Sequence, residues 1–104
     1  MPTLPVAIIG AGPVGLAAAA HLLRYQQPFA VLEAGRQAGS AIRQWGHVRT
    51  FSPWRYMVDA AARTLLEARG WTMPPADAPP TGNELVDRYL LPLAGVDAIR
   101  PNVR

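Results

Sequence analysis

The first third of the chain combines two apolar runs with a helical pattern. Residues 5–10 form a continuous apolar run that ends in glycine, and residues 29–33 form a second run that ends in Glu33. Between them, alanine and leucine side chains recur at helical spacing over residues 14–25. Continuous apolar runs are typical of strands covered on both faces, and a helical crossover makes two such strands parallel. The pattern therefore predicts a strand–helix–strand (βαβ) core over residues 5–33.

The middle of the chain predicts a loop and a helix. Residues 34–53 show no clear periodicity and are expected to form a loop. Asp59 is placed to cap a helix that runs to residue 69, and Gly70 is its stop signal. Four prolines make residues 71–80 an irregular connection. We expect a loop and helical segment over residues 34–95.

A further helix is predicted after the prolines. Thr81 and Glu84 have the spacing of a capping box. They precede an apolar stripe at helical spacing, which consists of Leu85, Val86, Tyr89 and Leu90. Pro92 is expected to close or kink this helix. Residues 96–104 are interpreted as the start of a third strand, where Pro101 suits only an edge position.

Three glycines in the first turn carry the functional signal. Gly10 permits a tight turn out of the strand, and Gly12 has no Cβ, so a pyrophosphate can approach the backbone. Gly15 lets the helix pack closely on the sheet. Pro13 lies in the first helical turn, where its missing N–H costs nothing. The free N–H groups and the positive end of the helix dipole then favour a phosphate.

An acidic residue at the end of the second strand completes the pattern. Glu33 follows Gly15 after seventeen intervening residues, and its carboxylate can accept both hydroxyl hydrogens of an adenosine ribose. The competing interpretation is a glycine-rich turn that binds nothing and a solvated Glu33. Arg36 follows within the next loop and is expected to contact the nucleotide, against the alternative of a solvated loop arginine. The expected cofactor-binding residues are Gly10, Ala11, Gly12, Pro13, Gly15, Glu33 and Arg36.

Composition narrows the range of functions. With no cysteine, disulfides and thiolate metal sites are excluded, and two separated histidines do not suggest a metal centre. The net charge is +3 and all ten basic residues are arginine, but they do not form a nucleic-acid-binding stripe. Residues 4–23 lack charges over a length that could span a membrane, yet their prolines and glycines fit the strand–turn–helix pattern better. We therefore expect a cytoplasmic protein.

The residues resemble a known family. Residues 10–15 together with Glu33 resemble the FAD-binding start of the two-dinucleotide-domain, glutathione-reductase-like oxidoreductases. Ala38, Gly39 and Ser40 look like the family's glycine turn after the acid, with alanine in place of its first glycine. Residues 45–54 and 80–85 are similar to the flavin-containing-monooxygenase-like branch.

The resemblance implies a fold and a chemistry. It implies an α/β fold: a Rossmann-like βαβ FAD/NAD(P)-binding domain, incomplete, with additional helices after the second strand. Such enzymes bind FAD in this first domain and NAD(P)H in a second one, and many oxygenate a small substrate. The chain is then an N-terminal segment, inactive by itself, that requires a C-terminal portion or self-associates.

Two alternatives stay open at this stage. One is a free-standing nucleotide-binding module without catalysis, and the other is the NAD-binding Rossmann segment of a dehydrogenase, where Glu33 disfavours NADP. No residue is nominated as catalytic, because the acids Asp59, Glu67 and Glu84 are better explained as helix caps or helix surface. Trp45, Phe51 and Trp54 are interpreted as packing anchors of the loop.

Overall fold

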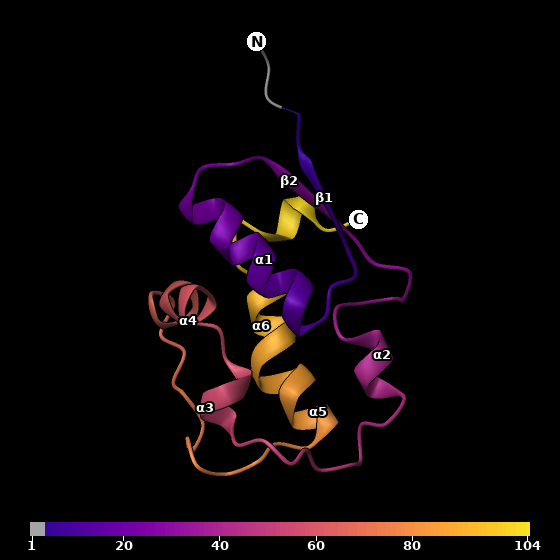
Figure 1. Cartoon of the computed structure of the whole chain (residues 1–104), viewed down its shortest axis with the longest axis vertical. Coiled ribbons are helices and arrows are strands. Elements are labelled where there is room, and N and C mark those ends of the chain that lie inside the picture. The colour runs from indigo at the N-terminus through magenta and orange to yellow at the C-terminus, as the bar shows by residue number, and fades with distance from the viewer. Residues whose placement is uncertain (1–3) are drawn as a thin grey trace.

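The computed structural model describes residues 4–104 and confirms the α/β, Rossmann-like architecture. Strand β1 (Val6–Ile9) leads through a glycine turn into helix α1 (Pro13–Arg24), and strand β2 (Phe29–Leu32) returns beside β1. The two strands are parallel, with Val6 opposite Phe29 and Ile9 opposite Leu32. The predicted βαβ core is therefore present (Figure 1).

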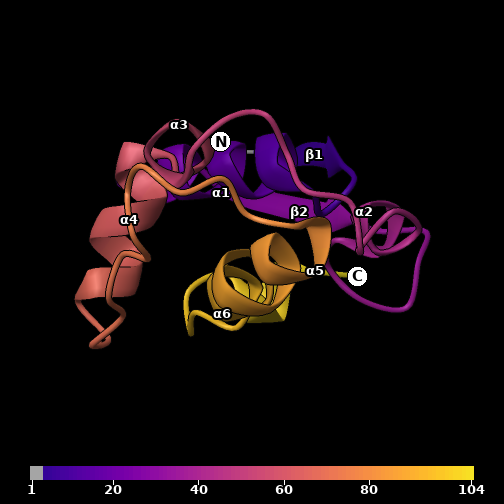
Figure 2. The same ribbon diagram turned by 90° about the horizontal axis from the view of Figure 1, so that it is seen from below.

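Short helices follow the second strand. They are α2 (Ser40–Arg43), α3 (Trp54–Met57), α4 (Ala60–Glu67) and α5 (Gly82–Leu85), then the π-helix η1 (Val86–Leu90), α6 (Leu91–Ala94) and the 3₁₀ helix η2 (Arg100–Asn102). The expected loop over residues 34–53 thus contains one helical turn, α2, because Gly39 adopts a left-handed conformation that begins it. Figure 1 shows α5 and α6 in line with each other, and Figure 2 views them end-on, with α4 set apart.

The C-terminal segment pairs with the sheet only at its end. Val103 forms a parallel bridge with Val31, and the Arg104 N–H donates to the Val31 carbonyl at 2.7 Å. The preceding residues form η2 instead of the strand expected from residue 96 onward. Strand β2 consequently lies between β1 and this segment, and β1 is at the edge of the described sheet.

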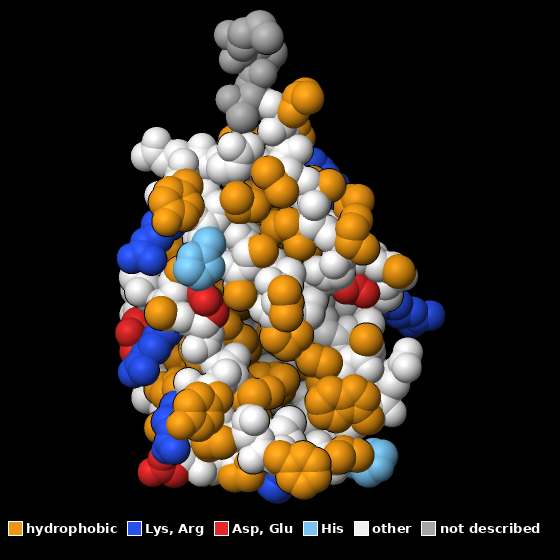
Figure 3. Space-filling model, viewed as in Figure 1, with side chains coloured by type: hydrophobic (Ala, Val, Ile, Leu, Met, Phe, Trp, Pro, Cys, Tyr) orange, Lys and Arg blue, Asp and Glu red, His pale blue; other side chains and the backbone are white. Residues whose placement is uncertain are grey.

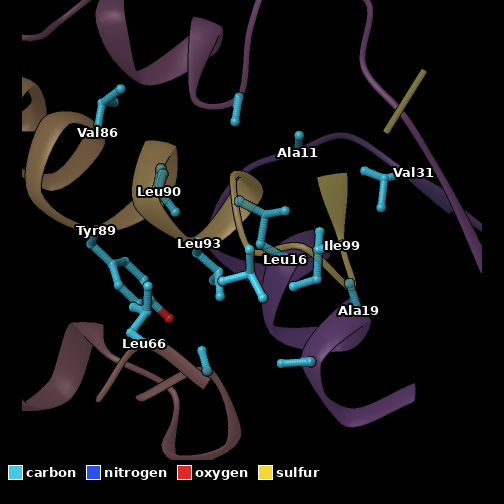
Figure 4. Close-up of a cluster of buried hydrophobic side chains, with 14 of the residues drawn as sticks. Ala11, Leu16, Ala19, Val31, Leu66, Val86, Tyr89, Leu90, Leu93 and Ile99 are labelled. Atoms are coloured by element: carbon cyan, nitrogen blue, oxygen red, sulfur yellow. The ribbon is translucent and has the colours of Figure 1, made fainter. Parts of the chain in front are cut away.

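One face of the sheet is buried and the other is exposed. Ile8 and Val31 pack in a core that Leu16 and Ala19 of α1 share with Ile99 (Figure 4). On the opposite face, Ile9 is 79% exposed and its register partner Leu32 is 43% exposed. The alternation of side chains along a strand explains this difference. The apolar surface of Ile9 and Leu32 is therefore left without cover by the described residues.

Both predicted helix caps are present. The Asp59 side chain accepts the N–H of Ala62 at 3.0 Å at the start of α4. Thr81 and Glu84 form a reciprocal capping box at the start of α5. Accepting the Thr81 N–H lowers the pKa of Glu84 more than burial raises it.

The helix that carries Pro92 does not end there. It continues to Ala94, and Gly95 follows it as expected. A π-helix widens the turn just before Pro92, where the proline ring would otherwise clash with the carbonyl four residues earlier. That carbonyl belongs to Arg88 and cannot receive a proline N–H; it accepts Nε1–H of Trp71 at 2.7 Å instead. The tertiary contact thus satisfies the group that proline leaves free.

Asp59 joins three elements. Besides capping α4, its side chain lies 2.9 Å from Nε2 of His21 in α1, and its backbone N–H donates to the hydroxyl of buried Tyr89 at 3.1 Å. Burial raises the pKa of Asp59, but the hydrogen bond from the Ala62 N–H and the nearby His21 together lower the pKa by more than burial raises it, so the net shift is downward. A lowered pKa in the folded state makes the ionised form stabilising.

We expect Asp59→Ala to lower the thermal midpoint of the full natural polypeptide at pH 7, by the loss of a cap that is typically worth about 1 kcal/mol. Because the folded-state pKa is lowered, the carboxylate's contribution is present above its unfolded-state pKa of about 4 and is lost as pH falls through the folded value. The difference from wild type should shrink between pH 7 and pH 3 in thermal melts. Asp97→Ala, which removes an exposed acid, is the control; an undiminished difference at pH 3 would contradict the argument.

Candidate functional site

The glycine turn begins directly after β1. Gly10 has φ of +95°, a left-handed conformation that favours glycine, and its N–H donates to the Leu32 carbonyl at 2.7 Å. Ala11 is fully buried beneath the turn. The chain therefore reverses within two residues and delivers Gly12 to the start of α1.

The first turn of α1 faces open space. Gly12 is the N-cap residue, and no side chain of the described residues caps the helix. A Cβ placed on Gly12 would meet nothing within 4 Å. Pro13 follows at the first helical position, where no N–H is needed. The turn thus presents backbone N–H groups beside an open space, an arrangement that suits an anion.

Gly15 serves close packing. A Cβ there would lie 2.0 Å from the Gly10 carbonyl oxygen and 3.2 Å from Cγ2 of Ile8. Any side chain would push α1 away from β1 and from the turn. The absence of a Cβ at this position lets the helix begin directly over the end of the strand.

Glu33 lies at the same turn. Its Oε1 accepts the N–H of Ala11 at 2.8 Å, and its Oε2 accepts the N–H of Gly35 at 2.8 Å. A carboxylate has about four acceptor positions, so each oxygen can still accept a hydroxyl hydrogen. This contact joins Ala11 to a residue 22 positions further along the chain. Sequence reasoning placed Glu33 at the site but missed its bond to the turn, because that bond depends on the paired strands.

The loop after Glu33 folds back onto the turn. Gly39, with φ of +78°, donates its N–H to the Ala11 carbonyl at 2.9 Å. Arg36 lies between Glu33 and Gly39 in the chain, and its side chain is exposed. It makes no side-chain hydrogen bond or ion pair within residues 4–104, so the structure leaves it available without bringing it to the turn.

Two other loop arginines have protein partners. Arg43 donates to the Asn83 side chain at 2.8 Å and pairs with Asp87. Arg49 donates to the Pro79 carbonyl at 2.6 Å and lies 3.5 Å from Glu84. These contacts attach the loop to α5, to η1 and to Pro79, which lies shortly before α5. The acidic residues Glu84 and Asp87 were the only sequence signal that could have indicated these ion pairs.

The loop's aromatic residues differ in their surroundings. Trp54 is buried, which confirms its packing role, and the Trp45 ring packs where a Cβ on Gly82 would lie only 2.9 Å away. Phe51 is fully exposed, so its assignment as a packing anchor was wrong. Figure 3 shows that exposed apolar side chains gather on the face that carries α1.

The comparisons place this arrangement in a family. The model of the FAD dependent oxidoreductase family matches residues 5–91. The chain therefore belongs to the FAD-dependent oxidoreductase family, and the match spans the turn, Glu33 and the helices up to η1. A comparison with curated proteins gave no match.

A solved structure shares the fold. A mutant flavin monooxygenase from Stenotrophomonas maltophilia aligns with a TM-score of 0.62 and 23% sequence identity. The alignment covers 100% of this chain and 28% of the monooxygenase chain. The chain is thus similar in fold to a little over a quarter of that protein. Among residues 4–104, no helix is long and apolar enough to span a membrane.

Proposed function

We propose that this chain binds the ADP moiety of FAD, with the pyrophosphate at the glycine turn and the adenosine ribose at Glu33. The observation that carries the proposal is the pairing of an uncapped, open helix start at Gly12 with a carboxylate held 2.8 Å from the N–H of Ala11. Backbone N–H groups suit the phosphates, and the remaining acceptor positions of Glu33 suit the two ribose hydroxyls. Bound FAD would supply the redox chemistry.

The other predicted site residues shape the turn or contact the nucleotide in this proposal. Gly10 and Gly15 shape the turn, and Pro13 starts the helix with the backbone angle that a first helical residue needs. Arg36 is proposed to contact the nucleotide from the loop, since an exposed guanidinium three residues after Glu33 can reach a phosphate or an adenine plane. The alternative of a module that binds nucleotide without redox chemistry is less favoured, because the family match names an oxidoreductase.

The whole protein's activity is a wider proposal. We propose that it is a flavin-dependent, NAD(P)H-using oxidoreductase or monooxygenase that acts in the cytoplasm. The resemblance of residues 45–54 and 80–85 to the monooxygenase-like branch supports this, as does the fold shared with a flavin monooxygenase. The exposed Ile9 and Leu32 support the further proposal that more protein, or a second copy, covers this face. NAD(P)H-dependent reduction of the bound flavin, read as loss of its absorbance, tests the proposed electron donor.

Glu33→Ala is expected to weaken ADP binding by about 1.5–3 kcal/mol, the range for a hydrogen bond to a charged acceptor. The test is titration of flavin-free full natural polypeptide with ADP and with 2′-deoxy-ADP. Wild type should bind the deoxy analogue more weakly than ADP, and the variant should not distinguish the two. Glu67→Ala, which removes an equal charge from α4, is the control and should keep the discrimination. If wild type bound ADP and 2′-deoxy-ADP with equal affinity, Glu33 would not be the residue that binds the ribose hydroxyls.

A further inference from the structure

Gly39, the loop residue that contacts the glycine turn, packs against the π-helix η1. A Cβ on Gly39 would lie 2.8 Å from Cγ2 of Val86 and 3.2 Å from Cδ1 of Leu90. Both side chains are fully buried and belong to the π-helix η1. The backbone of Gly39 therefore rests directly on Val86, without room for even a methyl group.

The same glycine orients one peptide of the turn. Its N–H donates to the Ala11 carbonyl at 2.9 Å. In a planar trans peptide the carbonyl and the next N–H point in opposite directions. Holding the Ala11 carbonyl toward Gly39 therefore directs the Gly12 N–H away from the loop. The N–H of Ala11, on the other side of that residue, is held by Glu33 at 2.8 Å.

We propose that Val86 is a positioning residue for nucleotide binding: through Gly39 it fixes the Ala11 carbonyl and so aims the Gly12 N–H at the pyrophosphate. This inference rests on the proposed function. It gives the π-helix a role besides accommodating Pro92, because Val86 is the first residue of η1 and its carbonyl accepts the Leu91 N–H across the widened turn. The connection consists of one packing contact, Val86 against Gly39, and one hydrogen bond, from the Gly39 N–H to the Ala11 carbonyl.

The inference makes a ligand-specific prediction. Val86→Ala removes the two methyl groups under Gly39, so the affinity for ADP should fall about 2- to 30-fold, the usual range for residues that act through a packed network. The affinity for adenosine, which has no phosphate, should stay the same. Val96→Ala is the matched control: it truncates another buried valine and should leave both affinities unchanged. Both ligands are titrated into flavin-free full natural polypeptide, below the thermal midpoint of each variant.

A double variant tests the contact itself. Gly39→Ala places a methyl group against Val86, in a left-handed conformation that alanine tolerates poorly, and should weaken ADP binding. Val86→Ala makes room for that methyl group, so the double variant should bind ADP more tightly than Gly39→Ala alone. If the Gly39 variant does not fold, the comparison of Val86→Ala with Val96→Ala still decides the question.

The outcomes separate this inference from the proposed function. If Gly12→Val keeps its ADP affinity, the turn is not the phosphate site and the proposed function fails. If Gly12→Val loses ADP while Val86→Ala behaves like Val96→Ala for both ligands, the proposed function stands and the role of Val86 is overturned. Equal losses of ADP and adenosine affinity in Val86→Ala would also overturn it, because they would indicate a general loosening of the fold.

Discussion

A Gly12→Val variant is expected to lose adenine-nucleotide binding while keeping its fold. The backbone at Gly12 is extended, with φ of −94°, and nothing lies within 4 Å of the position of a Cβ. Valine therefore fits the protein but occupies the space proposed for the pyrophosphate. Loss of two hydrogen bonds to a charged group costs about 3–6 kcal/mol, so the dissociation constant should rise at least ~100-fold. Calorimetric titration of the full natural polypeptide with FAD measures it.

Gly15→Ala provides the contrast. Its Cβ would lie 2.0 Å from the Gly10 carbonyl oxygen, so this variant should lose thermal stability as well as affinity. Circular dichroism and thermal melts distinguish the two cases. Unchanged FAD affinity in a folded Gly12→Val protein would mean that the turn is not the pyrophosphate site.

A polypeptide limited to these 104 residues is expected to be colourless, to lack NAD(P)H oxidase activity and to associate. Ile9 and Leu32 expose apolar surface on one face, and β1 is an edge strand of the described sheet. Each such side chain forgoes up to ~1.5–3 kcal/mol of burial, against a total stability of about 5–15 kcal/mol for a typical domain. An open apolar edge is also a template for strand pairing between molecules.

Size-exclusion chromatography with light scattering and a visible absorbance spectrum test this expectation. Ile9→Lys should reduce association, because a 79% exposed position accepts a charge without burying it. Ala98→Lys, at another exposed position that lies outside both strands, should not. A yellow, monomeric preparation that melts cooperatively would favour the free-standing nucleotide-binding module.

Local sequence signals account for most of the fold near the turn. The apolar runs, the glycines at 10, 12 and 15 and the two helix caps each act over a few residues, so their structural consequences could be predicted. The third strand was predicted to begin at residue 96, which is too early in the chain. Residues 100–102 form a 3₁₀ helix, and only Val103 pairs with Val31. Strand pairing depends on a partner far away in the chain, which the local pattern does not contain.

Contacts between distant residues were the part that the sequence did not reveal. The Ala11–Glu33 bond spans 22 positions, and the Arg43–Asn83 bond spans 40. The π-helix depends on Pro92 together with Trp71, whose indole N–H compensates the Arg88 carbonyl. Such features appear only once the elements are packed, and the proposed role of Val86 arises from one of them.

The most direct test of the central claim is a crystal structure of the full natural polypeptide with ADP bound. Our account predicts pyrophosphate oxygens within about 2.7–3.2 Å of backbone N–H groups at the start of α1, and both ribose hydroxyls at the Glu33 carboxylate. Density for ADP elsewhere on the protein, with the space beside Gly12 filled only by solvent, would contradict it.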